Sequence, residues 1–264
     1  MFDLWEYRSL IRKIAVTDLM LRYKNSLLGF FWSLLQPLLM FLVLFIVFSS
    51  IFDNSKIMYY PLYLLLGIIS WGLLDKGSNF SLNSIVGKPN LIKKIYFPRE
   101  VLVISACLTA LMMTTIELVV FCCLAVVYVL IIGKTIVLGA TVLLFPVAIL
   151  LEFVLVLGVS LIIASLNVRY RDIQWIWGVV MQAGFFVTPI MYSMDVFKGK
   201  NYASLINFNP IGAIMGLLRN TSIYSGISTI DVDTLGYVTF FSVVVLVIGW
   251  LVFKWFEPTF AEEV

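Results

Sequence analysis

Residues 90–100 read NLIKKIYFPRE and form a short basic island between two long apolar runs. Its lysines and Arg99 are costly to place in hydrocarbon, whereas both neighbouring runs are long enough to lie in lipid. Apolar and aromatic residues alternate with the charges, and Pro98 disfavours helical geometry at Phe97. This pattern favours a short amphipathic helix along the membrane surface that offers its aromatic side to another protein. The alternative is a membrane-facing loop that only carries positive-inside charges.

The composition indicates a polytopic membrane protein. Hydrophobic residues make up 62% of the 264 residues and charged residues 12%, against about half and a quarter in ordinary soluble domains. Histidine is absent from the sequence, which removes the commonest metal ligand and the usual acid–base group near neutral pH. The three cysteines share one apolar run without metal-site spacing, so we expect small core residues and no metal site.

Outward from the island, the apolar runs predict an all-α polytopic membrane protein with a single transmembrane domain. Residues 1–25 place apolar side chains on one helical face and predict an interfacial amphipathic helix. Six transmembrane helices are expected at residues 27–52, 61–86, 101–132, 136–164, 175–197 and 235–253. Pro37 is expected to kink the first of them.

Several polar residues fall inside the predicted spans. Asp75 and Lys76 lie near the middle of the second span and point in different directions on a helix, so they should face protein or a wet cavity. Glu117 and Glu152 are single acids in the third and fourth spans. We expect polar contacts between helices from both, with a proton relay as the alternative.

The region 198–220 interrupts the pattern of long spans. The apolar run at residues 211–218 is too short to cross about 30 Å of hydrocarbon at about 1.5 Å per residue. Re-entrant helices are therefore expected between the fifth and sixth spans, packed against protein or a water-filled cavity. Most of the 18 lysine and arginine residues fall on the side of the N-terminal segment and the island. Both termini are therefore expected in the cytoplasm.

Energy for any transport must come from elsewhere, because no GxxxxGK(S/T) phosphate loop occurs in the sequence. No polar stretch is long enough for a nucleotide-binding domain, so this chain is not expected to be an enzyme. Aromatic residues make up 15% of the chain, and many lie inside spans. Core packing and interface belts explain most such residues. The alternative is that some line a conduit in which flat rings stack on sugars.

Five segments resemble, in the right order and over nearly the whole chain, the permease subunit of ABC polysaccharide exporters. They are RYKNSLLGFFWSLLQPLL at 22–39, the island, NVRYRD at 167–172, TPIMY at 188–192 and NP at 209–210. The resemblance implies a homodimer in the cytoplasmic (inner) membrane with two copies of a separate cytoplasmic ATPase, which holds ATP and Mg²⁺. It implies a polyprenyl-diphosphate-linked glycan such as O-antigen or teichoic acid as cargo, with no cofactor on this chain and no nucleic-acid partner.

The resemblance also implies roles for individual residues. Arg22 and Lys24 stand at the cytoplasmic entrance, where a site for the lipid diphosphate is expected, with membrane anchoring as the alternative. Coupling to the ATPase is expected from Leu91, Ile92, Lys93, Lys94, Tyr96, Phe97, Arg99 and Glu100. The candidate channel aromatics are Trp32, Trp71 and Phe185, and the outer gate is expected at Pro189, Tyr192, Asn209 and Pro210.

Three other functions compete with this one. An ABC exporter of a small hydrophobic compound would share the fold, but the full set of loop segments speaks against it. A polyprenyl-phosphate glycosyltransferase should cluster carboxylates at one membrane face, whereas Glu117 and Glu152 are isolated. A gradient-driven transporter should show repeat symmetry between halves, and these halves differ in loop length and breakage.

Overall fold

The computed structural model describes residues 5–24, 31–51, 57–89, 97–132, 139–193, 208–225 and 231–260. Every regular element in these ranges is helical. The α-helices are α1 (Arg8–Tyr23), α2 (Phe31–Ile51), α3 (Tyr60–Leu82), α5 (Glu100–Ile132), α6 (Phe145–Arg169), α7 (Ile173–Val187), α9 (Pro210–Ser222) and α10 (Val232–Phe256). Short 3₁₀ helices, η3 (Ala140–Leu144) and η5 (Glu257–Thr259), precede α6 and follow α10.

The helix lengths and compositions identify a multi-pass membrane protein. Four described segments are long and apolar enough to cross a bilayer, namely Phe31–Ser49, Glu100–Ile131, Ala140–Arg169 and Val232–Thr259. They correspond to the first, third, fourth and last predicted spans. The second predicted span corresponds to α3, whose 23 residues are long enough to cross but which is less apolar because it carries Asp75 and Lys76.

The fifth predicted span, residues 175–197, is shorter in the structure. Helix α7 ends at Val187 after 15 residues, which is about 22 Å and less than the hydrocarbon thickness. Thr188 is extended, with φ −77° and ψ 140°, because Pro189 follows it and disfavours helical geometry at this position. Residues 188–193 are not helical. The chain therefore turns where we expected the helix to continue.

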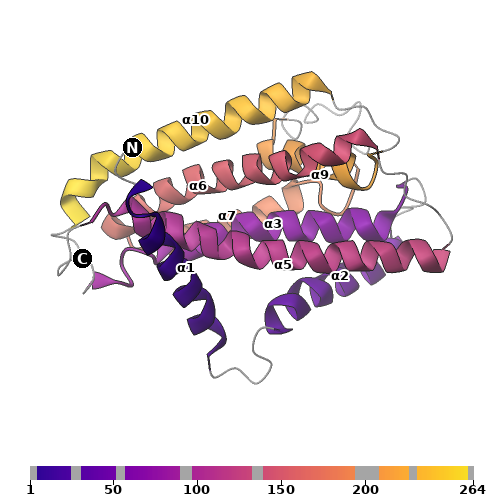
Figure 1. Cartoon of the computed structure of the whole chain (residues 1–264), viewed down its shortest axis with the longest axis horizontal. Coiled ribbons are helices and arrows are strands. Elements are labelled where there is room, and N and C mark those ends of the chain that lie inside the picture. Colours follow the sequence, from indigo (N-terminus) through magenta and orange to yellow (C-terminus); the bar gives the residue numbers. More distant parts are fainter. Residues whose placement is uncertain are drawn as a thin grey trace.

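Helix α3 forms the centre of the bundle. Seventeen of its 23 residues are buried, and it packs against α2, α5, α6, α7 and α9. In Figure 1 the long helices run side by side, with α10 along one edge and α1 and α2 along the opposite edge. A helix as deeply buried as α3 can carry polar groups only where protein or water partners are available. The polar groups of α3 therefore lie at the site described below.

Helices α6 and α10 approach each other closely at two glycines. A Cβ atom on Gly158 would lie 2.6 Å from the backbone nitrogen of Leu246, and one on Gly249 would collide with the Gly158 carbonyl. Small residues let helix backbones come together in lipid, where packing replaces the hydrophobic effect as the driving force. This contact fixes α10 to the bundle.

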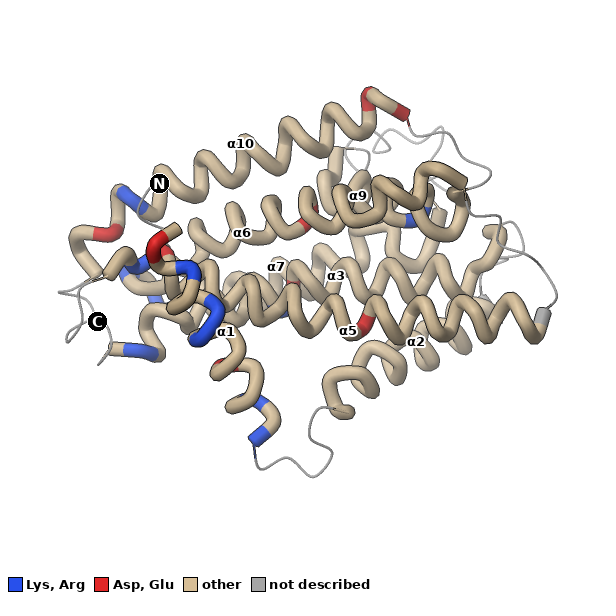
Figure 2. Tube along the Cα trace, in the orientation of Figure 1, with Lys and Arg blue, Asp and Glu red and all other residues tan. Residues whose placement is uncertain are grey.

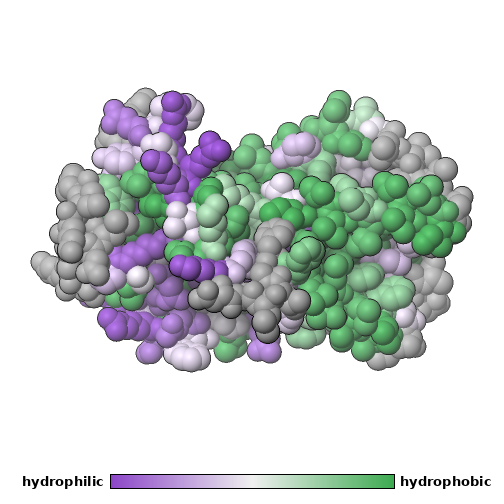
Figure 3. Space-filling model, turned by 60° about the horizontal axis from the view of Figure 1, so that its bottom comes forward, coloured by the Kyte–Doolittle hydropathy of each residue, from purple (hydrophilic) through white to green (hydrophobic). Residues whose placement is uncertain are grey.

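Charged residues gather at one end of the molecule. Figure 2 shows most of the blue and red segments at the end that holds α1 and the two chain termini, with α9 toward the opposite end. Figure 3 shows hydrophilic surface at that same end and apolar surface over most of the remaining face. The distribution is that of a membrane protein with one strongly charged face.

The predicted N-terminal helix is present as α1, which lies against α5. Ala15 is fully buried at this contact, and the Thr109 hydroxyl donates to the Ala15 carbonyl over 3.2 Å. Asp18 accepts a hydrogen bond from Lys88 over 2.6 Å and so ties α1 to the segment after α3. The position of α1 at the membrane surface stays a prediction.

Candidate functional site

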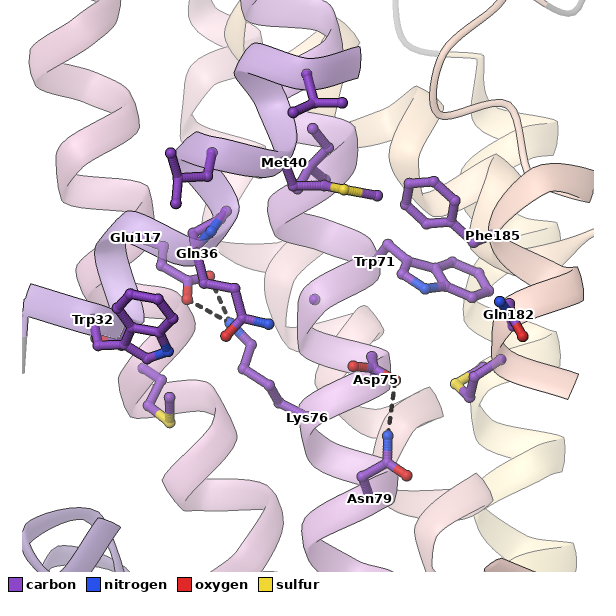
Figure 4. Close-up of a pocket in the computed structure, with 18 of the residues that line it drawn as sticks. Trp32, Gln36, Met40, Trp71, Asp75, Lys76, Asn79, Glu117, Gln182 and Phe185 are labelled. Carbon is purple, nitrogen blue, oxygen red and sulfur yellow. Dashed lines mark hydrogen bonds and ion pairs between the residues drawn. The ribbon is translucent and has the colours of Figure 1, made fainter. Parts of the chain in front are cut away.

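An open groove of about 710 Å³ lies between α2, α3, α5 and α7. Its walls combine aromatic rings with polar side chains, and these polar side chains lie on helices that are otherwise apolar. Figure 4 shows Trp32, Gln36 and Met40 of α2 on one side and Gln182 and Phe185 of α7 on the other. Helix α3 forms the floor and contributes Trp71, Asp75, Lys76 and Asn79.

The three aromatic residues expected in a channel all line this groove. Trp71 and Phe185 meet edge to face with their ring centroids 6.0 Å apart. Gly184 makes room for this contact, because a Cβ atom there would lie 2.8 Å from the Trp71 ring. Trp32 is half exposed on the opposite wall. The structure thus brings the three together from three helices, and their role as channel residues stays a prediction.

The polar residues of the groove form two hydrogen-bonded pairs. The Lys76 ammonium donates to both Glu117 carboxylate oxygens over 2.6 Å. The Lys76 side chain is 17% exposed and the Glu117 side chain 3% exposed, so both line the groove and the cation is the more exposed of the two. Asp75 accepts from the Asn79 amide over 2.8 Å. The expectation that Asp75 and Lys76 border a cavity is confirmed.

Glu117 and Glu152 both make the interhelical polar contacts expected from the sequence. Glu117 joins α5 to α3 through Lys76, as described above. Glu152 joins α6 to α3, because it accepts from the Ser70 hydroxyl over 2.5 Å. Among the described residues, Glu117 lines the groove and Glu152 does not. Of these two acids, only Glu117 therefore contributes directly to the charge of the groove.

A second polar cluster surrounds Arg219 on α9, whose side chain is buried with 4% exposed. Its guanidinium donates to the carbonyls of Pro189, Ile190 and Tyr63 over 2.9, 3.1 and 3.2 Å. The guanidinium also lies 3.4 Å from the centre of the Tyr63 ring. Gly67 on α3 leaves space for it, since a Cβ atom there would lie 2.6 Å from Nη2. We call these residues, with the 188–192 turn, the Arg219 cluster.

Two of the four predicted gate residues, Pro189 and Tyr192, belong to this cluster, and Asn209 contacts it through Thr188. Asn209 caps the start of α9, accepting from the Ile211 and Gly212 amides, and its own amide donates to the Thr188 hydroxyl over 2.8 Å. Pro210 is the first residue of α9, and the carbonyl of Pro189 accepts from Arg219. The Tyr192 hydroxyl donates to the Phe186 and Val187 carbonyls, and the Tyr63 hydroxyl donates to the Tyr192 carbonyl. A gating role stays a prediction.

Tyr63 was not predicted as a gate residue, and neither was Arg219. The available signal was its isolation: it ends an apolar run in α9 that contains no carboxylate. A buried cation without an acidic neighbour in sequence must find carbonyl or ring partners.

The end of the basic island is fixed within this chain. Phe97 is buried, with 7% exposed. Glu100 is also buried and pairs with Lys254 of α10 over 2.5 Å, while Arg99 donates to the carbonyl of Glu257. The Phe97 ring packs in the core of this chain, and its role in coupling stays a prediction. Five of the predicted coupling residues lie outside the described residues, namely Leu91, Ile92, Lys93, Lys94 and Tyr96.

The predicted entrance residues lie at the end of α1. The Arg22 guanidinium stacks 3.3 Å from the centre of the Phe80 ring of α3. Partial desolvation at this contact lowers the pKa of Arg22 from its ordinary value, although a guanidinium stays charged. Lys24 is exposed. Binding of a diphosphate by this pair stays a prediction.

Within the described parts of the chain, no three His, Cys, Asp or Glu side chains gather closely enough to hold a metal ion. The arrangement instead offers a groove with rings, amides and a carboxylate, which are groups that bind by stacking and hydrogen bonding.

Residues 10–223 match the family model described as ABC-2 type transporter. The O-antigen export system permease protein RfbA of Klebsiella pneumoniae is 27% identical over 249 residues, which are 94% of this chain and 92% of that protein. Its counterpart of the same name from Myxococcus xanthus is 27% identical over 214 residues, covering 81% and 80%. The polysialic acid transport protein KpsM of Escherichia coli is 24% identical over 250 residues, covering 92% and 94%. The matched family region includes the groove and the Arg219 cluster.

Proposed function

Because the chain belongs to the ABC-2 type transporter family, we propose that it is the permease subunit of an ATP-driven exporter of a lipid-linked polysaccharide such as O-antigen. It would act as a multi-pass protein of the cytoplasmic membrane. The observation that carries the proposal is the groove, which places Trp32, Trp71 and Phe185 beside amide and carboxylate groups. Sugar rings have apolar faces that stack on aromatic rings and hydroxyl edges that need hydrogen-bond partners.

The alternative cargo, a small hydrophobic compound, fits the groove less well. Such a compound would leave the amides of Gln36 and Gln182 without partners, which costs free energy. A glycosyltransferase is disfavoured for a different reason. Its carboxylates should cluster to bind a metal and phosphate, whereas Glu117 and Glu152 each contact a different partner inside the bundle.

We infer a homodimer, and the open side of the groove supports this. Lys76 and Asp75 border this opening, and ionised groups within a span are stable only against protein or water. Neither α7 with 15 residues nor α9 with 13 is long enough to cross the bilayer alone. A second copy facing the groove would enclose these groups in a water-filled channel. In this arrangement α7 and the 188–192 turn together make the fifth of six crossings, both termini lie in the cytoplasm, and α9 forms the re-entrant outer gate.

The energy would come from two copies of a cytoplasmic ATPase that bind ATP and Mg²⁺. The charged end of the molecule, where the island meets the end of α10, is the surface on which we place this partner. Glu100 and Arg99 connect the island to Lys254 and Glu257. A force exerted by the ATPase on residues 90–96 would therefore be transmitted to both α5 and α10.

Co-purification with the candidate ATPase tests the proposal. Tagged wild-type chain should bring down the ATPase, and Tyr96→Ala should lose it while the chain still folds. Tyr170→Ala is the matched control, because this exposed tyrosine lies in the other basic loop and its removal should leave the complex intact. If no ATPase accompanies the wild type, the proposed function is wrong. If both tyrosine variants behave alike, the assigned coupling surface is wrong.

A further inference from the structure

The groove has an uneven charge, and this observation extends the proposed function on which the inference rests. Its described lining contains three ionisable side chains, namely Asp75, Lys76 and Glu117. Two are carboxylates and one is an ammonium. Since both oxygens of Glu117 accept from Lys76, the ammonium is already neutralised. Asp75 is then the uncompensated charge, and the groove is negative when all three groups are ionised.

The remaining polar groups are neutral and can both donate and accept hydrogen bonds. Gln36 and Gln182 expose their amides from opposite walls, and Asn79 lies beside Asp75 on the floor. An amide offers two donors and a carbonyl acceptor, which suits hydroxyl groups because these also donate and accept. A carboxylate or sulfate on a ligand would instead need a cation, and the described lining offers only the one held by Glu117.

We propose that the groove is a binding site for an uncharged segment of glycan, with Asp75 as the residue that excludes acidic sugars. Trp32 and Phe185 provide the surface for the sugar face, because Trp71 beside Phe185 is only 8% exposed, while Asp75 and the amides bind hydroxyls. An acidic sugar would bring a second negative charge next to Asp75 in a site walled by apolar helices, where like charges repel more strongly than in water. Glu117 contributes to this selectivity because it pairs with Lys76, so the ammonium is not available to an acidic sugar.

The test measures binding of two oligosaccharides of equal length to the full chain in lipid nanodiscs. The neutral probe is mannohexaose and the acidic probe is hexagalacturonate, and ligand-observed NMR measures the affinity of each. Wild type should bind mannohexaose and show at least about tenfold weaker binding of hexagalacturonate at low salt. Asp75→Asn should raise hexagalacturonate binding at least about tenfold relative to mannohexaose binding, and so remove most of this difference. Asp75→Glu retains the charge and should retain the difference.

Asp233→Asn is the matched control, because it removes the same charge from the exposed first turn of α10. It should leave the difference between the probes as in wild type. Equal binding of both probes by wild type, or equal effects of Asp75→Asn and Asp233→Asn, overturns the inference. If wild type still co-purifies with the ATPase in that case, the proposed function stands and only the charge selectivity fails. Absence of the ATPase would remove the proposed function instead.

Discussion

Lys76 and Arg219 are both cations inside an apolar bundle, but they are satisfied in different ways. Arg219 donates to three backbone carbonyls and stacks on Tyr63. Lys76 donates to a carboxylate and borders an open groove. The three carbonyls that Arg219 binds are held in position, and so is the backbone that carries them. Lys76 lies beside a cavity, so its side chain can exchange one partner for another. The comparison favours a framework role for Arg219, which holds the proposed gate region together, and a binding role for the groove.

Two glycines on α3 express the same difference. A Cβ atom on Gly67 would lie 2.6 Å from Arg219, which is closer than real contacts allow. A Cβ atom on Gly72 would lie 3.4 Å from the end of the Lys76 side chain, an ordinary contact that the lysine can accommodate. Changes near Arg219 should therefore reduce stability, and changes near Lys76 should alter glycan binding.

The largest effect is expected from Arg219→Met. Three buried carbonyls would lose their donor at about 1 to 3 kcal/mol each, so the free energy of unfolding should fall by at least about 3 kcal/mol. Thermal unfolding in detergent measures this loss. Gly216→Ala on the same helix is the control, because a Cβ atom there meets no neighbour, and it should be neutral or slightly stabilising. Equal melting of Arg219→Met and wild type would remove the framework role.

A smaller effect is expected from Gly67→Ala. The new methyl group displaces the guanidinium, and such overpacking typically costs about 1 to 3 kcal/mol of stability. Gly72→Ala should melt like wild type, yet it narrows the groove next to Lys76 and should weaken glycan binding. Measuring melting and mannohexaose binding on both variants checks the comparison. The opposite pattern, with Gly72→Ala less stable and Gly67→Ala poorer in binding, would reverse it.

The cap of α9 should contribute less. Asn209→Ala removes the oxygen that accepts from the Ile211 and Gly212 amides, which should lower stability by about 1 kcal/mol. Asn209→Ser keeps a capping oxygen and serves as the control. Thermal unfolding should place the serine variant between the alanine variant and wild type, and an alanine variant as stable as wild type would show that the cap is dispensable.

Glu117→Gln should change binding most selectively. The pair is largely buried, but the glutamine carbonyl can still accept from Lys76 and the ammonium borders the groove, so the loss of stability should stay below that of Arg219→Met. Lys76 becomes available to anions, and binding of hexagalacturonate should increase. Glu152→Gln is the control because Glu152 contacts Ser70 and does not line the groove in the described residues. An unchanged affinity for hexagalacturonate in Glu117→Gln would contradict the assignment of Lys76.

The sequence predicted the helices well where length and apolar character decide them. Residues 101–132 were expected as a span, and α5 covers Glu100–Ile132. The end of α7 was missed because we assumed a full crossing, while the turn at Thr188 and Pro189 ends the helix earlier. The resemblance placed Trp32, Trp71 and Phe185 on a common path, and the structure brings them to one groove.

Two features of the site could not be predicted from the sequence. Lys76 and Glu117 are 41 residues apart, and their pairing depends on how α3 and α5 rotate against each other. Arg219 finds backbone carbonyls as partners, and every residue offers one, so no side-chain pattern marks them. Such contacts become visible only once the helices are packed.

Export of a lipid-linked, uncharged polysaccharide by the complex in proteoliposomes tests the central claim most directly. The chain is reconstituted with its ATPase, and ATP-dependent transfer of the glycan across the membrane is compared between wild type and Trp71→Leu. We predict transfer by wild type, and a several-fold loss in Trp71→Leu although ATP hydrolysis and folding persist. Undiminished transfer by Trp71→Leu, or ATP hydrolysis by wild type without any glycan transfer, would contradict the account.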